Sequence, residues 1–254
     1  MPTSRVLIVC TSHASLGTTG ERTGLWLEEL AAPFWVFRDA GFTVDVVSMA
    51  GGEVPLDPRS LEEKDRPAPT QRFLDDAATM TMIRQTRALA DVATEDYDAV
   101  FLPGGHGTMW DFAADPDLAE TVAATYDAGR VVAAVCHGPA GLVGAVRADG
   151  KALVAGRRIT GFTNAEEAAV GLTDKVPFLL ESRLRELGGI FDAGADFKSH
   201  VVRDGNLVTG QNPQSSAAVA QAIVEALGEA REDPATAAHQ AGSSAKPEAR
   251  PPRA

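Results

Sequence analysis

Short apolar runs alternate with a segment of helical periodicity at the start of the chain. Residues 5–11 and 43–48 are β-branched apolar runs, typical of strands buried on both faces of a parallel sheet. Between them, apolar side chains recur at helical spacing, namely Leu27, Leu30, Phe34 and Phe37. Gly41 follows, as a helix C-cap would. This β-α-β order predicts an α/β fold with a mostly parallel central sheet and helices on both faces.

The next segment, 51–96, interrupts this alternation. It begins with prolines and polar residues, and its later part has helical periodicity. We interpret it as an insertion over the sheet, near the candidate site. Strands are then predicted at 98–103 and 130–136, separated by a helix that begins at Pro116 with Asp115 as its N-cap.

Shorter elements are predicted in the last third of the chain. A short strand at 158–162 and a helix over 176–187 precede a hairpin over 200–209, which turns at Asp204 and Gly205.

The chain is expected to end in a helix and a tail. The helix is predicted from Asn212, its cap, and Pro213 to about Gly228. The remaining sequence has no apolar periodicity and cannot repay the entropy of ordering. We therefore predict one α/β domain over 1–229 and a disordered tail over 230–254.

Composition narrows the class of function. The chain has 254 residues, 44% of them hydrophobic, and a formal net charge of −12. This charge repels phosphate backbones and anionic lipids, so we expect neither nucleic-acid nor membrane-surface binding. No signal-peptide core or membrane-spanning run is visible, which predicts a cytoplasmic protein. The two cysteines, Cys10 and Cys136, are too few for a disulfide framework.

The strongest chemical signal is Ala-Val-Cys-His-Gly-Pro over 134–139, at the end of the most apolar predicted strand. Small residues flank Cys136 two positions before and after it, at Ala134 and Gly138, as a nucleophile elbow requires. A helix that begins just after the thiol would direct its N–H groups at the sulfur and favour the thiolate. The alternative is an ordinary buried cysteine, which is also our interpretation of Cys10.

A second signal is the loop Pro-Gly-Gly-His-Gly over 103–107, which directly follows a predicted strand. Gly104 and Gly105 allow close backbone approach and positive φ, so the loop suits an oxyanion hole or another anion site. For a glycine pair alone, a tight turn without a ligand is the simpler interpretation. His106 could line a pocket, although an exposed loop histidine is the default.

Carboxyl groups supply candidates for acid–base chemistry. Glu29 lies near the apolar side of the first helix, where desolvation would keep it protonated, but the pattern slightly favours a solvated pair with Glu28. Glu166 and Glu167 could orient His137, or could simply complement a helix N-terminus. The histidines lack the close pairing of a metal site, so we expect no metal.

Five motifs, taken in order, resemble the ThiJ/PfpI superfamily over about residues 4–228. They are Glu29 with Pro33, the 103–107 loop, the 134–139 elbow, Ile-Thr-Gly-Phe-Thr over 159–163 and Leu-Val-Thr-Gly-Gln-Asn-Pro over 207–213. The resemblance implies a flavodoxin-like three-layer sandwich, shared with class I glutamine amidotransferases, and suggests a homodimer. The late His-x-Glu pair of the glutaminases is missing, which argues against that activity.

The elbow, the Gly-His-Gly loop and the Thr-Gly-Phe-Thr segment look most like the chaperone-like branch with glyoxalase III activity. That resemblance implies cofactor-independent conversion of methylglyoxal, or a related 2-oxoaldehyde, to a 2-hydroxy acid. It matches four residues to roles: Cys136 to the nucleophile, His137 to its acid–base partner, Glu29 to the carboxyl that hydrogen-bonds the sulfur, and Glu167 to the acidic third member. Glu166, one position away, is the alternative third member.

In the mechanism that this resemblance implies, the Cys136 thiolate adds to the aldehyde carbon. Backbone N–H groups of Gly105 and His137 hold the oxyanion, with Gly104 and His106 beside the substrate. Either His137 or the carboxyl of the first helix then moves a proton between the two carbons, and water releases the product.

Other functions stay open at this point. The same thiol could hydrolyse amides or peptides, which a large open cleft would favour, whereas a small closed pocket favours the aldehyde. The protein could instead be a holdase chaperone with an exposed apolar patch, or a redox sensor in which Cys136 is readily oxidised.

Overall fold

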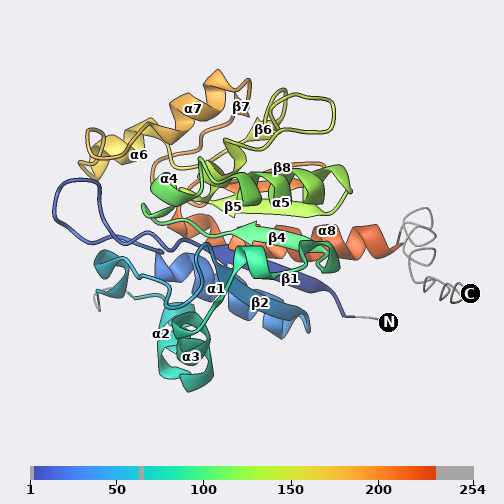
Figure 1. The fold of residues 1–254 in the computed structure, drawn as a ribbon, viewed down its shortest axis with the longest axis horizontal. Coiled ribbons are helices and arrows are strands. Elements are labelled where there is room, and N and C mark those ends of the chain that lie inside the picture. Colours follow the sequence, from blue (N-terminus) through green and yellow to red (C-terminus); the bar gives the residue numbers. More distant parts are fainter. Residues whose placement is uncertain (1–2, 63–65, 233–254) are drawn as a thin grey trace, which may run out of the picture.

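The chain builds one central sheet of seven strands. A computed structural model describes residues 3–62 and 66–232 (Figure 1). The strand order is β3-β2-β1-β4-β5-β9-β8, and neighbouring strands are parallel except for the β8–β9 pair. The strands are β1 Arg5–Cys10, β2 Thr43–Ser48, β3 Arg87–Ala88, β4 Ala99–Leu102, β5 Val131–Val135, β8 Val201–Asp204 and β9 Leu207–Gly210. The predicted, mostly parallel sheet is confirmed.

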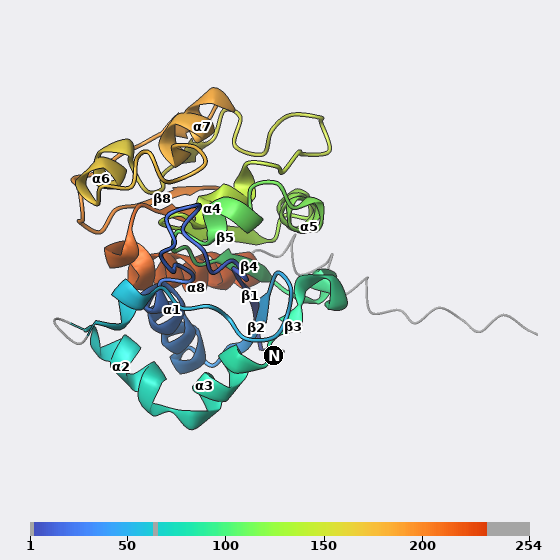
Figure 2. The same ribbon diagram turned by 60° about the vertical axis from the view of Figure 1, so that its left-hand side comes forward.

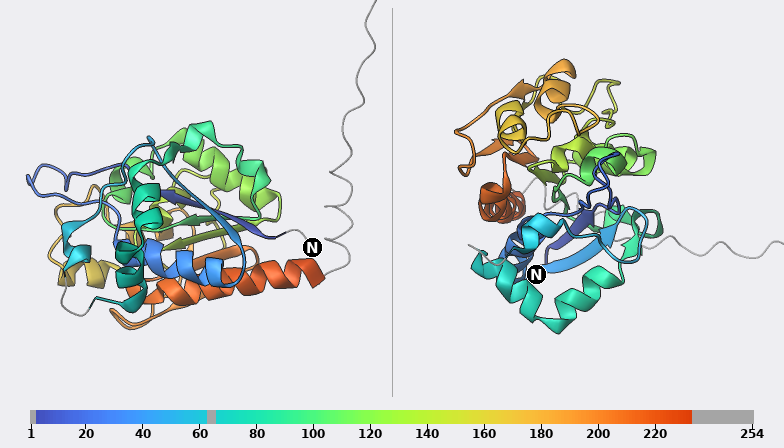
Figure 3. Two further views of the ribbon diagram at one scale, coloured as in Figure 1. Left: turned by 90° about the horizontal axis from the view of Figure 1, so that it is seen from below. Right: turned by 90° about the vertical axis from the view of Figure 1, so that its left-hand side faces the viewer.

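Helices cover both faces of this sheet. Helices α1 (Leu27–Asp39) and α8 (Ser216–Glu232) pack side by side on one face, and α5 (Pro116–Asp127) covers the other (Figure 3). This arrangement is the three-layer sandwich of flavodoxin-like proteins. The other helical segments are α2 Ala68–Asp75, α3 Ala77–Arg84, α4 Thr108–Asp111, α6 Asn164–Ala169, α7 Leu180–Glu186 and the 3₁₀ turns η1 Pro58–Leu61, η2 Leu89–Asp91, η3 Thr94–Asp96, η4 Gly138–Leu142 and η5 Pro213–Ser215. No helix in the described ranges has the length and apolarity needed to cross a membrane.

Local capping residues set several of the element boundaries. Asp115 accepts a hydrogen bond from the Leu118 N–H at 2.9 Å, and Pro116 is the first helical residue, so α5 begins where predicted. Gly41, at φ 80°, follows α1, and Gly205, at φ 62°, turns the β8–β9 hairpin. Both positions have the left-handed backbone that favours glycine.

The 51–96 segment does more than lie over the sheet. Its helical run is divided because Asp76 accepts hydrogen bonds from the N–H groups of Ala78 and Thr79 and thereby starts a second helix, α3. Helix α2 packs against α1, and the end of the segment adds the edge strand β3 beside β2 (Figure 2). The η1 part of the segment reaches the candidate site through Arg59.

The segment between β5 and β8 departs from the predicted elements. The short strand β6, Arg158–Ile159, does not join the main sheet but pairs in parallel with β7, Ile190–Phe191. Helix α7 begins at Leu180 rather than at 176, because a residue before proline is restricted to extended backbone and Pro177 follows that position.

The last helix is longer than predicted. Helix α8 passes through Gly228 and reaches Glu232, so residues 230–232 are helical rather than part of a tail. Gly228 did not end the helix because its backbone lacks the positive φ of a glycine cap. The rest of the predicted tail, 233–254, lies outside the described residues.

Strands β1, β4 and β5 form the centre of the sheet. Their residues are buried, apart from the first residue of β1, which is partly exposed. In open α/β sheets, ligands bind at the carboxyl ends of strands where successive connections diverge to opposite faces. The connection after β1 leads to α1, whereas the one after β4 leads to α4 and α5 on the other side. The loops that carry the candidate residues meet at this edge.

Candidate active site

Cys136 occupies a strained turn directly after β5. Its φ is 60°, a left-handed conformation that a cysteine adopts only when the surroundings impose it. The Cys136 N–H donates to the Gly210 oxygen at 2.9 Å, and the Cys136 oxygen accepts from the Phe162 N–H at 2.8 Å. At Gly138, an added Cβ would lie 2.1 Å from the Leu102 oxygen. This contact explains the small residue two positions after the thiol.

The thiol is enclosed, and its environment does not favour the resting thiolate. Cys136 is 3% exposed, and its Sγ lies 3.3 Å from His137 Nδ1. Burial raises the pKa of the Cys136 thiol, the Glu29 carboxyl adds to the shift, and the His137 backbone N–H lowers it only in part. The prediction that N–H groups at a helix start would favour the thiolate is therefore wrong for this site. The element after the thiol is the five-residue 3₁₀ turn η4, whose dipole is short, and desolvation outweighs it.

Glu29 is buried beneath the 103–107 loop, and the solvated pair favoured by the sequence pattern is wrong. Its exposed fraction is 0%, and Oε2 accepts a hydrogen bond from the Gly104 N–H at 2.7 Å. The other oxygen, Oε1, is buried without a conventional hydrogen-bond partner. Burial raises the pKa of Glu29 well above its usual range, which hydrogen bonding to Cys136 and Gly104 offsets only in part. A neutral carboxylic acid has one O–H donor, and Glu29 would carry it on Oε1, because Oε2 accepts from Gly104.

The protonated state of Glu29 predicts a pH-dependent stability. Because its folded-state pKa is raised, its contribution is fully present below the unfolded pKa of about 4.3 and is lost as pH rises through the folded value. Glu29→Gln cannot ionise and should lose less thermal stability between acidic and alkaline pH. The measurement is Tm against pH for both proteins in a Cys136→Ala background, which removes the thiol titration. Equal slopes would mean that Glu29 does not retain a proton on folding.

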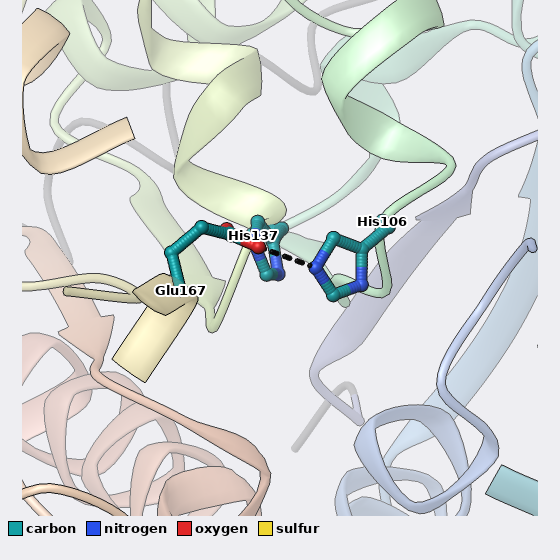
Figure 4. Close-up of side chains that lie close together, drawn as sticks. All are labelled: His106, His137 and Glu167. Atoms are coloured by element: carbon teal, nitrogen blue, oxygen red, sulfur yellow. Dashed lines mark hydrogen bonds and ion pairs between the residues drawn. The ribbon is translucent and has the colours of Figure 1, made fainter. Parts of the chain in front are cut away.

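Two imidazoles converge on one carboxylate (Figure 4), and one of them, His137, also contacts the thiol. His137 Nε2 lies 2.7 Å from Glu167 Oε2, and His106 Nε2 lies 3.0 Å from Glu167 Oε1. The two rings are 4.1 Å apart between centroids. His106 is only 5% exposed, so the default of an exposed loop histidine is wrong. Sequence spacing concealed this pairing because the two histidines follow different strands, β4 and β5, that are adjacent in the sheet.

Opposite charge and hydrogen bonding keep this carboxylate ionised. Burial alone would raise the pKa of Glu167, but hydrogen bonds from His106 and His137 outweigh it and hold the pKa well below its usual range. Burial lowers the pKa of His106 to about 4, so this imidazole is neutral at physiological pH. By distance, the three groups could hold a metal ion. Each ligand atom, however, already has a hydrogen-bond partner within the group, so we interpret the cluster as a proton network.

The neighbouring carboxylate, Glu166, hydrogen-bonds groups other than His137. It forms a capping box with Thr163 at the start of α6, and its Oε1 accepts from the Phe197 N–H and from Asn212 Nδ2, each at 2.8 Å. The sequence left two acidic residues as alternatives. Glu167 is the one that contacts the imidazoles, whereas Glu166 hydrogen-bonds Thr163, Phe197 and Asn212.

The 103–107 loop approaches the elbow and α1 closely. A Cβ added at Gly104 would lie 2.6 Å from the His137 backbone nitrogen. A Cβ added at Gly105, which has φ 96°, would lie 2.3 Å from the Gly24 oxygen. The Gly104 N–H is already bonded to Glu29, so the predicted oxyanion role cannot use that group without breaking the bond. The Gly105 and His137 N–H groups stay as candidates.

Asp57 and Arg59 belong to the site but were not among the predicted residues. Arg59 Nη2 lies 3.3 Å from His106 Nδ1, and its Nε and Nη2 both bind the buried Asp57 carboxylate. The Asp-Pro pair at 57–58 is a helix-start signal that sequence could have revealed, but the contact with His106 is tertiary. Cys10, by contrast, is fully buried, and burial raises the pKa of its thiol so far that it stays protonated.

The fold and the site together define a class: flavodoxin-like α/β proteins in which a buried cysteine follows a central strand on a strained turn. The model of the DJ-1/PfpI family matches residues 23–226, and the chain belongs to this family.

Several relatives share most of this chain. It is 33% identical over 238 residues to the glutathione-independent glyoxalase HSP31 of Saccharomyces cerevisiae, covering 89% of this chain and 99% of that protein. The crystal structure of glyoxalase III from Candida albicans matches with a TM-score of 0.81 and 29% identity, over 88% of this chain and 97% of that one. Rapid Encystment Protein 24 KDa of Francisella tularensis matches with a TM-score of 0.85 and 39% identity, over 89% and 99%.

Proposed function

We propose that the protein converts methylglyoxal or a related 2-oxoaldehyde to the 2-hydroxy acid without glutathione or another cofactor. The observation that carries this proposal is the enclosed Cys136 thiol, 3.3 Å from His137 Nδ1 and beside the buried Glu29 carboxyl. Relatives that cover most of the chain are named glutathione-independent glyoxalases. The proposal includes a cytoplasmic location, predicted from the sequence, and assembly as a homodimer, which the family resemblance suggests.

The first step uses the contact between the thiol and the imidazole. His137 Nδ1 accepts the thiol proton as Sγ adds to the aldehyde carbon, which forms a hemithioacetal and leaves a negative charge on oxygen. The Gly105 and His137 backbone N–H groups are the donors proposed for this oxygen. Because burial disfavours a resting thiolate, transfer of the proton to His137 accompanies attack.

The following steps balance without an electron carrier. A base removes the proton from the former aldehyde carbon, and the neighbouring carbon is protonated through an enediol, which leaves a thioester of the 2-hydroxy acid. One carbon is oxidised while its neighbour is reduced. The proposal assigns these proton transfers to His137, which contacts Sγ, and to Glu29, whose raised pKa favours its protonated form. Water then hydrolyses the thioester, releasing the acid and restoring the thiol.

Closure of the site supports a small substrate rather than a peptide. The five side chains proposed to take part are each at most 5% exposed: Glu29, His106, Cys136, His137 and Glu167. A polypeptide would need an open cleft along the elbow to bring its amide to the sulfur. A three-carbon aldehyde needs only a brief local opening.

The test is cofactor-free consumption of methylglyoxal with detection of lactate. Wild type should form lactate, and Cys136→Ser should form none above background, because serine at this position lacks a sufficiently acidic nucleophile. Cys10→Ser is the matched control and should retain activity, since Cys10 lies within β1. A folded wild-type protein that forms no lactate would overturn the proposed function.

A further inference from the structure

A chain of polar contacts continues outward from the candidate site into η1. It runs from Cys136 through His137, Glu167 and His106 to Arg59 and Asp57, and each contact is at most 3.3 Å long. Of these residues, the reaction steps proposed above use only Cys136 and His137. Nothing in that mechanism explains why a guanidinium should be held against the far side of His106.

Asp57 fixes Arg59 in place. The Asp57 carboxylate is fully buried and accepts hydrogen bonds from the Arg59 N–H, Nε and Nη2, and from Thr23 Oγ1. Burial alone would raise the pKa of Asp57, but these bonds and the charge of Arg59 lower it, so the carboxylate is ionised. Arg59 is thus a fixed cation with a two-point anchor, and its Nη2 reaches His106 Nδ1 at 3.3 Å.

The contacts with Arg59 and with Glu167 both require the proton of a neutral His106 ring to be on Nε2. A guanidinium has only donors, so His106 Nδ1 must accept, and the proton of the neutral ring must be on Nε2. From Nε2 it is donated to Glu167 Oε1. The other oxygen, Oε2, accepts from His137 Nε2, and a neutral His137 ring with its proton on that nitrogen presents an unprotonated Nδ1 to the sulfur.

We propose that Asp57 and Arg59 are a positioning pair: Arg59 holds His106 as the neutral Nε2–H tautomer, so that Glu167 is shared between both imidazoles and His137 presents a free Nδ1 to Cys136. The effect of this pair on the reaction rests on the proposed function, whereas the positions of the protons do not depend on it.

Removing Arg59 would change the charge that Glu167 experiences. The charged and titratable groups that face His106 are Arg59 from η1, Glu167 from α6 and His137 from the elbow. Without the cation, His106 can bind a second proton at higher pH, or move its proton to Nδ1. Either change alters the hydrogen bond that Glu167 accepts from His106.

The direct test is ¹⁵N NMR of the histidine side chains in the full-length protein. Wild-type His106 should be neutral, with Nδ1 unprotonated, from neutral pH down to about pH 5. In Arg59→Met, its titration midpoint should rise above that of the wild type, because the charge of Arg59 disfavours protonation of the ring. Arg157→Met is the matched control, because Arg157 and Arg59 have similar exposed fractions, 35% and 37%, and each pairs with an aspartate. A protonated Nδ1 in the wild type would overturn the inference.

Arg59→Met leaves the buried Asp57 carboxylate without its partner and could unfold the protein. The double variant Asp57→Asn/Arg59→Met removes both charges, and it replaces the single variant in the titration if Arg59→Met does not fold. It should show the same rise in the His106 titration, and an unchanged titration there would contradict the inference.

A double-mutant cycle tests whether Arg59 acts through His106. Arg59→Met should lower kcat about tenfold with little change in KM, as loss of a supporting hydrogen bond typically does. In a His106→Gln background, where the side-chain amide can replace Nε2 as the donor to Glu167 but cannot titrate, the same change should alter kcat less than about twofold. Equal losses in both backgrounds would overturn the inference. If the wild type forms no lactate but His106 is the expected tautomer, only the proposed function is overturned. If the wild type forms lactate but His106 Nδ1 is protonated, only this inference is overturned.

Discussion

Glu167→Gln should lower kcat for the 2-oxoaldehyde reaction by about 10³- to 10⁴-fold while the protein stays folded. The ionised carboxylate accepts from Nε2 of both His106 and His137. An amide can instead donate to His137 Nε2, which would move the ring proton to Nδ1. The nitrogen that faces Cys136 Sγ at 3.3 Å would then be a donor and could not accept the thiol proton.

The neighbouring variant Glu166→Gln is the control for this experiment. It weakens the capping box with Thr163 and the bonds to Phe197 and Asn212, so we expect a loss of about 1–2 kcal/mol in the free energy of unfolding. Its kcat should change only a few-fold. Steady-state kinetics with thermal unfolding separates the two outcomes. A Glu166 variant that is inactive beside a fully active Glu167 variant would reverse the assignment of the third member.

Gly138→Ala should destabilise the folded protein by about 3 kcal/mol or more, and lower Tm by roughly 6–12 °C. The added Cβ would lie 2.1 Å from the Leu102 oxygen and 3.0 Å from its carbonyl carbon. These are backbone atoms of β4, a central strand, and they cannot move without disturbing its pairing with β1 and β5. The measurement is thermal or denaturant unfolding of the purified variant.

Gly228→Ala is the matched glycine control. This residue is exposed within α8, and an added Cβ would meet nothing within 4 Å. Alanine is favoured over glycine in a helix by about 0.5–1 kcal/mol, so this variant should be slightly more stable than wild type. A Gly138 variant as stable as the Gly228 variant would show that the elbow tolerates the added methyl group.

Much of the sheet could be predicted because its central strands are apolar along their whole length. The runs 5–11 and 130–136 have no polar alternation, since both faces of these strands are covered by helices. The Asp115–Pro116 start of α5 was equally clear, because the same side chain that marks the cap in sequence makes the capping hydrogen bond.

The parts that could not be predicted depend on contacts between distant segments. The surroundings of Glu29 and His106 are made by the 103–107 loop, by η1 and by α6. Local sequence therefore gave no sign that His106 is buried, and for Glu29 it gave only helical spacing, which did not decide between burial and a solvated pair. The same limit hid Arg59. Cys136 was recognisable because an elbow has local steric requirements, whereas the raised pKa of its thiol results from the surrounding tertiary structure.

The hydrogen bond from Cys136 to Gly210 has a consequence for synthesis of the protein. Strand β5 pairs with β4 on one edge and with β9 on the other, and β9 is the last strand in the described part of the chain. A nascent chain that ends before residue 210 therefore has an unpaired β5 edge and an unsecured elbow. The thiol acquires its enclosed, strained setting only after β9 has been synthesised and has paired with β5.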